Sequence, residues 1–340
     1  AVGLRNDNSQ KLFLRWLLRQ RKFLNDIKMS KVALIIIYNH QFNQNIEVIE
    51  KLYKDRFRNI YHLVPFYTGN RENVISVYEC SLYFQGYVTQ GMKSYFREEY
   101  IHYFFIADDL LLNPVINEYN YAECIRLTAK TCFIPGFITL HDPGFWWSRV
   151  GDAYHWKLKA NGVEADGELP DYEHALTKFQ QFELSIEPLR FRQIWKTPNK
   201  LKDWIKPFFG RGSLKHCNFI LNYLRSSDAK FNLSYPIVGS YSDIFIIDSN
   251  SIKQFCHYCG VFAATQLFVE VAIPTAMVLV AKEIVTENEL KLKGKALWTK
   301  EEYMELDKFD NELQQLLDHF PSDQLYLHPV KLSKWNTSLR

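Results

Sequence analysis

Residues 101–114 read IHYFFIADDLLLNP. Aromatic and aliphatic side chains lead directly into two adjacent carboxylates, Asp108 and Asp109, and an Asn-Pro pair closes the segment. A short continuous apolar run is typical of a strand that is covered on both faces, and Asn-Pro favours a turn. The segment therefore predicts a buried strand over 100–106 that delivers two like charges to its carboxyl end.

The segments that precede this strand alternate between strand and helix patterns. Continuous apolar runs predict strands, and apolar residues spaced by three and four predict helices. The expected strands cover 31–37, 59–67 and 74–79, and the expected helices cover 47–58 and 82–99. This alternation indicates an α/β fold with a mostly parallel sheet and right-handed crossovers.

Two polar segments follow strands of the expected sheet. Tyr38, Asn39 and His40 come after the first strand, and Asp108 and Asp109 come after the fourth. Ligands of open α/β sheets bind beyond the carboxyl ends of the strands. We therefore expect both segments to contribute to one site.

The second half of the chain contains a long apolar segment, GVFAATQLFVEVAIPTAMVLVA (260–281), whose single charge is Glu270. Its length suits a membrane span, but Pro274 and a lone carboxylate at its centre argue against one. We predict a buried helix of a folded core. The other patterned segments predict strands over 131–140 and 242–248, short helices within 151–215, an acidic amphipathic helix over 299–319 and a closing segment over 325–335.

Residues 9–28 predict an additional N-terminal helix that is basic and carries Trp16 and Phe23. A basic helix with aromatic side chains can lie on an anionic membrane surface, and the alternative is a packing helix or a contact between copies of the chain. We expect residues 1–30 to form this amphipathic helix and residues 31–340 to form a single domain.

Composition limits the classes of function. The net charge of +3 is too small to argue for nucleic acid as a partner. Aromatic residues make up 16% of the chain, which suits either a large core or a protein that stacks sugars or bases. Of the six cysteines, Cys256 and Cys259 form the one CxxC pair, so a structural zinc site is poorly supported. Reduced cysteines and the lack of a signal peptide in this sequence favour a cytoplasmic protein.

Two adjacent carboxylates at a strand end repel each other unless something compensates their charge. Mg²⁺ and Mn²⁺ prefer hard oxygen ligands and often complete their shells with phosphate oxygens. The alternative is that the pair caps a helix beginning near Pro114 or is simply exposed. The C-terminal LHPVK (327–331) supplies His328 as a third ligand and Lys331, three residues on, as a phosphate contact, although His328 could equally be an ordinary paired histidine. Together these residues describe a diphosphate site bridged by a cation.

The segment IADDLLLNP (106–114) resembles the DXD-type motif of GT-A glycosyltransferases, which use nucleotide-sugar donors. The leading half of alternating strands and helices and the His-x-x-Lys element are similar too, so that the resemblance covers 31–140 and 237–332. SYSDIFII (240–247) and LFVE (267–270) resemble bacterial enzymes that build cell-surface polysaccharide such as O-antigen or capsule. Ala107 departs from the motif, because many families have its first Asp there.

The resemblance implies a GT-A-like, Rossmann-type mixed sheet flanked by helices, with a nucleotide-binding half over 31–140 and an acceptor-binding half over 141–340. It implies that Asp109 and His328 hold Mn²⁺ or Mg²⁺ and that Asp108 binds ribose or a metal-bound water. The nucleotide, by analogy UDP, would lie near Tyr38, Asn39 and His40 and near Thr68–Arg71, with Arg71 as a contact. Lys331 would neutralise the leaving diphosphate.

Two further carboxylates are candidates for catalysis. Asp243 precedes an apolar strand and could accept hydrogen bonds from sugar hydroxyls, or it could be an ordinary turn residue. Glu270 lies in an apolar segment, where burial should raise its pKa and suit it to act as a general base on an acceptor hydroxyl, unless it pairs with a Lys or Arg. Trp146 and Trp147 are equally suited to a sugar platform or to the core.

These observations predict a metal-dependent glycosyltransferase that moves a sugar from a nucleotide donor to a hydroxyl of a glycan or lipid-linked glycan in surface polysaccharide synthesis. Residues 9–28 would give peripheral contact with the inner face of the cytoplasmic membrane. A nucleotidyltransferase is a second possibility, but the segment YNHQFNQN after the first strand has no Gly, Lys or Arg. A carbohydrate-binding protein on a decayed transferase fold is a third, and Ala107 favours it.

Overall fold

The computed structural model describes residues 31–39, 42–141, 148–160, 162–190, 221 and 230–339. The predicted N-terminal helix, His40, Trp146 and Trp147 lie outside these residues. The main strands are β1 (Val32–Ile37), β2 (Ile60–Pro65), β3 (Val74–Val77), β4 (His102–Ala107), β6 (Thr131–Phe133), β9 (Ile244–Asp248) and β10 (Glu283–Val285). The main helices are α2 (Gln44–Tyr53), α3 (Gln85–Tyr95), α4 (Tyr121–Cys124), α10 (Ile252–Ala264) and α11 (Val269–Val280).

The main strands form one seven-stranded mixed sheet in the order β10-β6-β9-β4-β1-β2-β3. β1 pairs in parallel with β2 and β4, and β2 pairs in parallel with β3, as the alternating pattern predicts. β9 runs antiparallel to both of its neighbours, β4 and β6. The chain is therefore an α/β protein with a mixed sheet flanked by helices.

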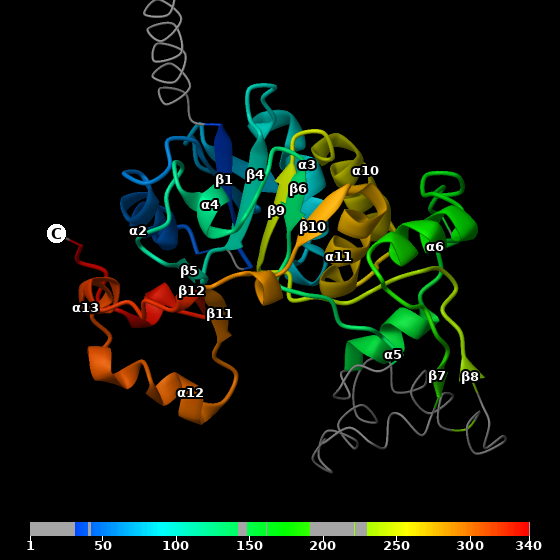
Figure 1. The fold of residues 1–340 in the computed structure, drawn as a ribbon. Helices are drawn as coiled ribbons and strands as arrows, with labels where there is room; N and C mark the ends of the chain where they lie inside the picture. The colour runs from blue at the N-terminus through cyan, green and yellow to red at the C-terminus, as the bar shows by residue number, and fades with distance from the viewer. Residues whose placement is uncertain are drawn as a thin grey trace, which may run out of the picture.

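Both faces of the sheet are covered, which explains why its strands read as continuous apolar runs. Helices α3, α10 and α11 lie on one face, and α2 and α4 lie on the other (Figure 1). Alternate residues of β4 enter the two resulting cores: Phe105 packs with the first group of helices, and Phe104 and Ile106 pack on the side of α2. β4 thus crosses the centre of the molecule before it reaches Asp108 and Asp109.

A second, three-stranded sheet in the order β11-β12-β5 lies beside the large one (Figure 1). It consists of β5 (Leu111–Leu112), β11 (Lys293–Ala296) and β12 (Gln324–His328). β12 is antiparallel to β5, so the C-terminal strand returns to the segment that follows Asp109. The other described elements are α5 (Ser148–His155), α6 (Tyr172–Gln181), β7 (Leu189–Arg190), β8 (Lys230–Phe231), α12 (Lys300–Met304), α13 (Leu313–Asp318) and the 3-10 turns Ser81–Tyr83, Glu287–Glu289, Asp307–Phe309 and Leu332–Lys334.

Asn113 ties these two distant segments together. Its Nδ2 donates to the carbonyl of Gln324 at 2.7 Å, its backbone N–H donates to Leu325, and its Oδ1 accepts from the N–H of Val115. The side chain is buried, so truncation leaves polar groups without partners.

We expect Asn113→Ala to lower the free energy of unfolding by about 1–3 kcal/mol, the usual cost of an unsatisfied buried polar group. Urea denaturation followed by circular dichroism measures the loss. Asn70→Ala, at an exposed loop position, is the matched control and should change stability by less than about 0.5 kcal/mol. Equal stability of the two variants would contradict the role given to Asn113.

Two predicted helices are wrong in their extent. The segment 260–281 is divided between α10 and α11, and Gln266 takes a left-handed backbone conformation at the break. The segment 299–319 is divided into α12, a 3-10 turn and α13, with left-handed residues Asp310 and Asn311 between them. A continuous helix cannot pass through such residues, because left-handed conformations interrupt its hydrogen bonds. Among the described helices, none has the length and hydropathy needed to cross a bilayer.

Candidate functional site

The site is centred on a contact between Asp109 and His328, which are 219 residues apart in the sequence. Oδ1 of Asp109 lies 3.0 Å from Nε2 of His328. The backbone reinforces this contact, because the N–H of Val330 donates to the carbonyl of Asp109 at 2.7 Å. Pairing of β12 with β5 therefore brings the two side chains together, as the cation hypothesis requires. No helix begins near Pro114, so the predicted alternative of a helix cap does not apply.

Asp243 is the second carboxylate of this cluster. Its Oδ1 lies 4.0 Å from Nε2 of His328, and its carbonyl accepts a hydrogen bond from the N–H of Ala107 at 2.8 Å. Asp243 precedes β9, and since β9 runs against β4, the start of β9 meets the end of β4. Burial raises the pKa of the Asp243 carboxyl; the nearby Asp109 adds to this rise, and His328 and Asn39 partly offset it.

His328 is held from both sides of its ring. Nε2 faces the two carboxylates, and Nδ1 is hydrogen-bonded to the hydroxyl of Tyr241. Burial by itself would lower the pKa of His328, but the hydrogen bond with Asp109 and the surrounding negative charges outweigh it, so the pKa is raised above 6.5. The imidazole is therefore held in one orientation by Tyr241 and Asp109, and carboxylates surround it.

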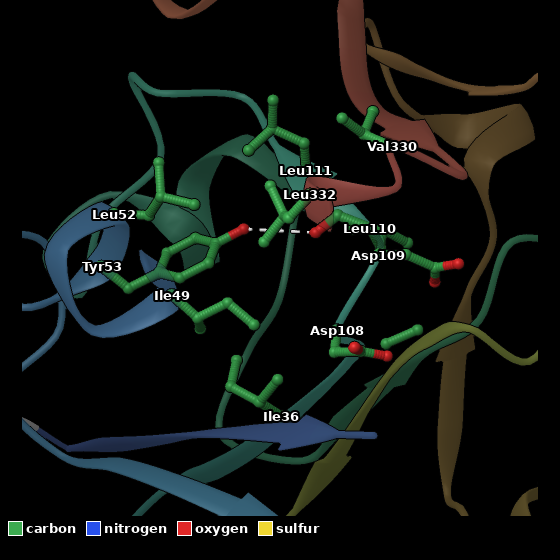
Figure 2. Close-up of a pocket in the computed structure, with 11 residues that line it drawn as sticks. Ile36, Ile49, Leu52, Tyr53, Asp108, Asp109, Leu110, Leu111, Val330 and Leu332 are labelled. Carbon is green, nitrogen blue, oxygen red and sulfur yellow. Dashed lines mark hydrogen bonds between the residues drawn. The ribbon is translucent and has the colours of Figure 1, made fainter. Parts of the chain in front are cut away.

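Asp108 lies on the other side of the cluster and is buried. Its Oδ1 accepts from the backbone N–H of Asn39 at 3.3 Å, and its Oδ2 accepts from Nδ2 of Asn45 at 3.4 Å. Both carboxylates line one side of a small apolar pocket, and Ile49 and Leu52 line the opposite side (Figure 2). That pocket has a volume of about 10 Å³, too small for a ligand, so it forms the packed support behind Asp108.

The donor set bears on whether a cation fits here. Nε2 of His328 lies 3.0 Å from Oδ1 of Asp109 and 4.0 Å from Oδ1 of Asp243. Carboxylates and imidazole are ligands that Mn²⁺ accepts. Over the described ranges, however, no group of three or more His, Cys, Asp or Glu side chains is arranged so that it could hold a metal ion. A cation at this position would therefore need water and substrate phosphates to complete its shell, as is common for Mg²⁺.

Lys331 lies on an exposed turn three residues beyond His328. It lines a pocket of about 350 Å³ together with Tyr303, Pro329, Lys334 and other residues. Burial chiefly raises the pKa of Tyr303, and the charge of Asp109 adds to this rise. Lys331 therefore borders open space, and its neighbour Val330 donates its backbone N–H to the carbonyl of Asp109.

Glu270 is not at the centre of an apolar helix but in the first turn of α11. It is half-buried, and its carbonyl accepts a hydrogen bond from the N–H of Ser240 at 2.8 Å. Burial chiefly raises the pKa of Tyr241, and nearby carboxylates, Glu270 among them, add to that shift. The helix break at Gln266 thus places Glu270 beside the cluster rather than within the core.

The predicted nucleotide contacts differ in their exposure. The backbone of Asn39 reaches Asp108, but the ring of Tyr38 is fully buried and its hydroxyl is hydrogen-bonded to Nδ1 of His62 at 3.0 Å. Tyr38 therefore packs in the core next to Asn39 and offers no exposed surface on which a nucleotide base could stack. Arg71 is exposed and forms an ion pair with Glu47 at 2.7 Å.

The contact of His62, the partner of Tyr38, with Glu50 predicts that stability depends on pH. Nε2 of His62 lies 2.8 Å from Glu50, and this hydrogen bond, together with one from Asn73, lowers the pKa of Glu50 below 4.5 despite partial burial. A depressed carboxyl pKa stabilises the folded state above the unfolded pKa, and this contribution is lost as the pH falls through the folded value. We expect Glu50→Gln to make the acid unfolding curve shallower below pH 4.5, measured by urea midpoints at a series of pH values. Identical slopes for the two proteins would contradict this expectation.

Three aromatic residues at the site, Tyr241, Trp298 and Tyr326, were not expected from the sequence. Tyr241 stacks on Tyr326 with ring centroids 5.9 Å apart and planes 4° apart, and Trp298 lies edge-on to Tyr241 at 6.3 Å. Tyr241 stands within the quoted SYSDIFII, two residues before Asp243, which was a usable signal. Trp298 follows a short polar strand and carried no such signal.

Comparison of the chain with protein-family models, curated proteins and solved structures finds no match. The geometry around Asp109 and His328 is what supports an assignment of function.

Proposed function

We propose that this protein is a metal-dependent glycosyltransferase of the GT-A type, which transfers a sugar from a nucleotide donor to a hydroxyl of a glycan or lipid-linked glycan. The observation that carries this proposal is the convergence of Asp109, Asp243 and His328 beyond the end of β4. The seven-stranded mixed sheet flanked by helices agrees with the architecture that the resemblance to GT-A enzymes implies.

Asp109 and His328 would hold Mn²⁺ or Mg²⁺, with Asp243 as a nearby third carboxylate. When bound, the cation would offset the negative charge that develops on the leaving diphosphate. Asp108 is oriented by Asn39 and Asn45, and it would accept a hydrogen bond from the ribose of the donor. Lys331 would face the phosphates from its exposed turn, because its side chain borders open space near Asp109.

The acceptor hydroxyl must lose a proton during transfer, and Glu270 is the candidate base. It is half-buried beside Tyr241, and it is separate from the carboxylates that face His328. Asp243 lies only 4.0 Å from His328, so we assign it to the residues proposed to hold the cation. A positioned carboxylate that accepts this proton typically contributes a rate factor of about 10²–10⁴.

Isothermal titration of UDP with and without Mn²⁺ tests the proposal. We expect binding that depends on Mn²⁺, followed by slow hydrolysis of one donor in a panel of nucleotide sugars. Release of pyrophosphate from a nucleoside triphosphate instead would indicate a nucleotidyltransferase. Absence of metal-dependent nucleotide binding would contradict both enzyme classes.

A further inference from the structure

Trp298 is an exposed indole placed beside the site. Trp298 is 63% exposed, and the centroid of its ring lies 6.0 Å from the centroid of the His328 ring. It also lies edge-on to Tyr241, whose hydroxyl is bonded to His328. The exposed indole therefore lies next to a residue that is proposed to hold the cation.

The backbone on both sides of Trp298 is fixed by specific contacts. Before it, Ala296 pairs with His328 in the β11–β12 ladder, and the N–H of Leu297 donates to the carbonyl of His328 at 2.7 Å. After it, Oε2 of Glu302 accepts from the backbone N–H groups of Trp298 and Thr299, each at 2.7 Å. The N–H of Glu302 donates back to Thr299, which completes a capping box at the start of α12.

This arrangement orders an aromatic face without burying it. The face of an indole carries negative potential, which attracts the weakly positive C–H groups on the apolar face of a pyranose. Binding sites commonly combine a few such aromatic walls with a small number of polar groups. A sugar ring on Trp298 would have its hydroxyls close to the polar cluster around His328.

The nucleoside of the donor is a less suitable occupant of this position. The polar groups proposed for the ribose are Asp108 and its partner Asn39, which follow β4 and β1 of the large sheet. Trp298 instead belongs with β11 and β12 of the small sheet, and it meets the cluster through Tyr241 and His328. The diphosphate over Asp109 would therefore lie between the nucleoside and the indole.

We propose that Trp298 is the stacking platform for a neutral sugar ring of the acceptor. This inference rests on the proposed glycosyltransferase function and names the part of the substrate that this side of the site binds. It assigns to Trp298 a role in acceptor affinity, with no role in holding the nucleotide.

Saturation-transfer NMR with the methyl glycosides of glucose, galactose and N-acetylglucosamine tests the inference, in the presence of UDP and Mn²⁺. At least one glycoside should bind the wild type, and Trp298→Ala should weaken its binding roughly tenfold, while Trp298→Phe retains most of it. Tyr172→Ala removes a 40% exposed ring at the start of α6 and should leave glycoside binding unchanged. Circular dichroism confirms that each variant is folded.

Titration of the same variants with UDP and Mn²⁺ separates this inference from the proposed function. Unchanged UDP affinity in Trp298→Ala, together with weaker glycoside binding, supports the inference. A similar loss of UDP affinity would place the indole on the nucleoside and overturn the inference while leaving the transferase proposal intact. Absence of glycoside binding in a wild type that binds UDP, or a change in oligomeric mass on removal of the ring, would also overturn it. Failure of the wild type to bind UDP with Mn²⁺ would instead contradict the proposed function.

Discussion

Asp109→Asn is expected to weaken Mn²⁺-dependent binding of UDP by roughly 100-fold or more, since even partners of metal ligands typically contribute 10–100-fold. The substitution preserves the size of the side chain and its ability to hydrogen-bond His328, but it removes the negative charge. A neutral amide is a weaker ligand for a divalent cation than a carboxylate is. Isothermal titration with UDP, with and without Mn²⁺, measures the change.

Asp323→Asn is the matched control, because Asp323 is an exposed carboxylate just before β12. It should leave the affinity for UDP unchanged. We also expect the effects of Asp109→Asn and His328→Gln to be less than additive when combined, because both residues would hold the same ion. Fully additive effects, or equal UDP affinity in Asp109→Asn and wild type, would show that the two residues do not share a cation.

Phe105→Ala is expected to reduce the free energy of unfolding by about 3–5 kcal/mol, the usual cost of truncating a fully buried Phe. Phe105 lies in the middle of β4 and is completely buried. Its ring stacks on Phe245 of β9 with centroids 4.6 Å apart and meets Tyr95 of α3 edge-on at 5.8 Å. Truncation would leave a cavity between the two central strands and the helix layer. Urea denaturation measures the loss.

Phe42→Ala provides the comparison, because Phe42 is 43% exposed. Its expected cost is well below that of Phe105→Ala, since less apolar surface is returned to water. Phe105→Leu should recover most of the loss, because a leucine fills much of the same space. Similar losses for Phe42→Ala and Phe105→Ala would contradict the central role of the β4–β9 pair.

Local patterns predicted the first half of the sheet well. The runs around Leu34, Leu63 and Phe104 are strands because both faces of the sheet are covered, and continuous apolarity is a direct consequence of that burial. Asp108 and Asp109 could be placed at the carboxyl edge of the sheet because they directly follow one of these runs. The contact of Asp109 with His328 was expected from their chemistry, and the structure brings them together.

The direction of β9 could not be predicted, because apolar runs read the same in parallel and antiparallel strands. This direction decides the position of Asp243. In a fully parallel sheet, a residue preceding its strand would lie at the edge opposite Asp109. Reversal of β9 moves it to the same edge, within 4.0 Å of His328.

The helix errors have a different cause. Residues 260–281 are almost entirely apolar, so periodicity gave no sign that the chain turns at Gln266. The turn depends on one left-handed residue and on packing between two buried helices, which are properties of the tertiary structure. Trp298 was missed for a related reason, because its place beside His328 comes from the β11–β12 pairing and not from neighbouring residues.

The long separation of Asp109 and His328 along the chain has a consequence during synthesis. A ribosome that has translated the whole large sheet has still not supplied the imidazole, because the last strand of that sheet, β10, ends at Val285 and His328 follows it. The nascent polypeptide therefore lacks the Asp109–His328 contact until β12 has emerged and joined β5. Under the proposed function, translation that stops before residue 328 would yield a product that cannot consume the sugar donor.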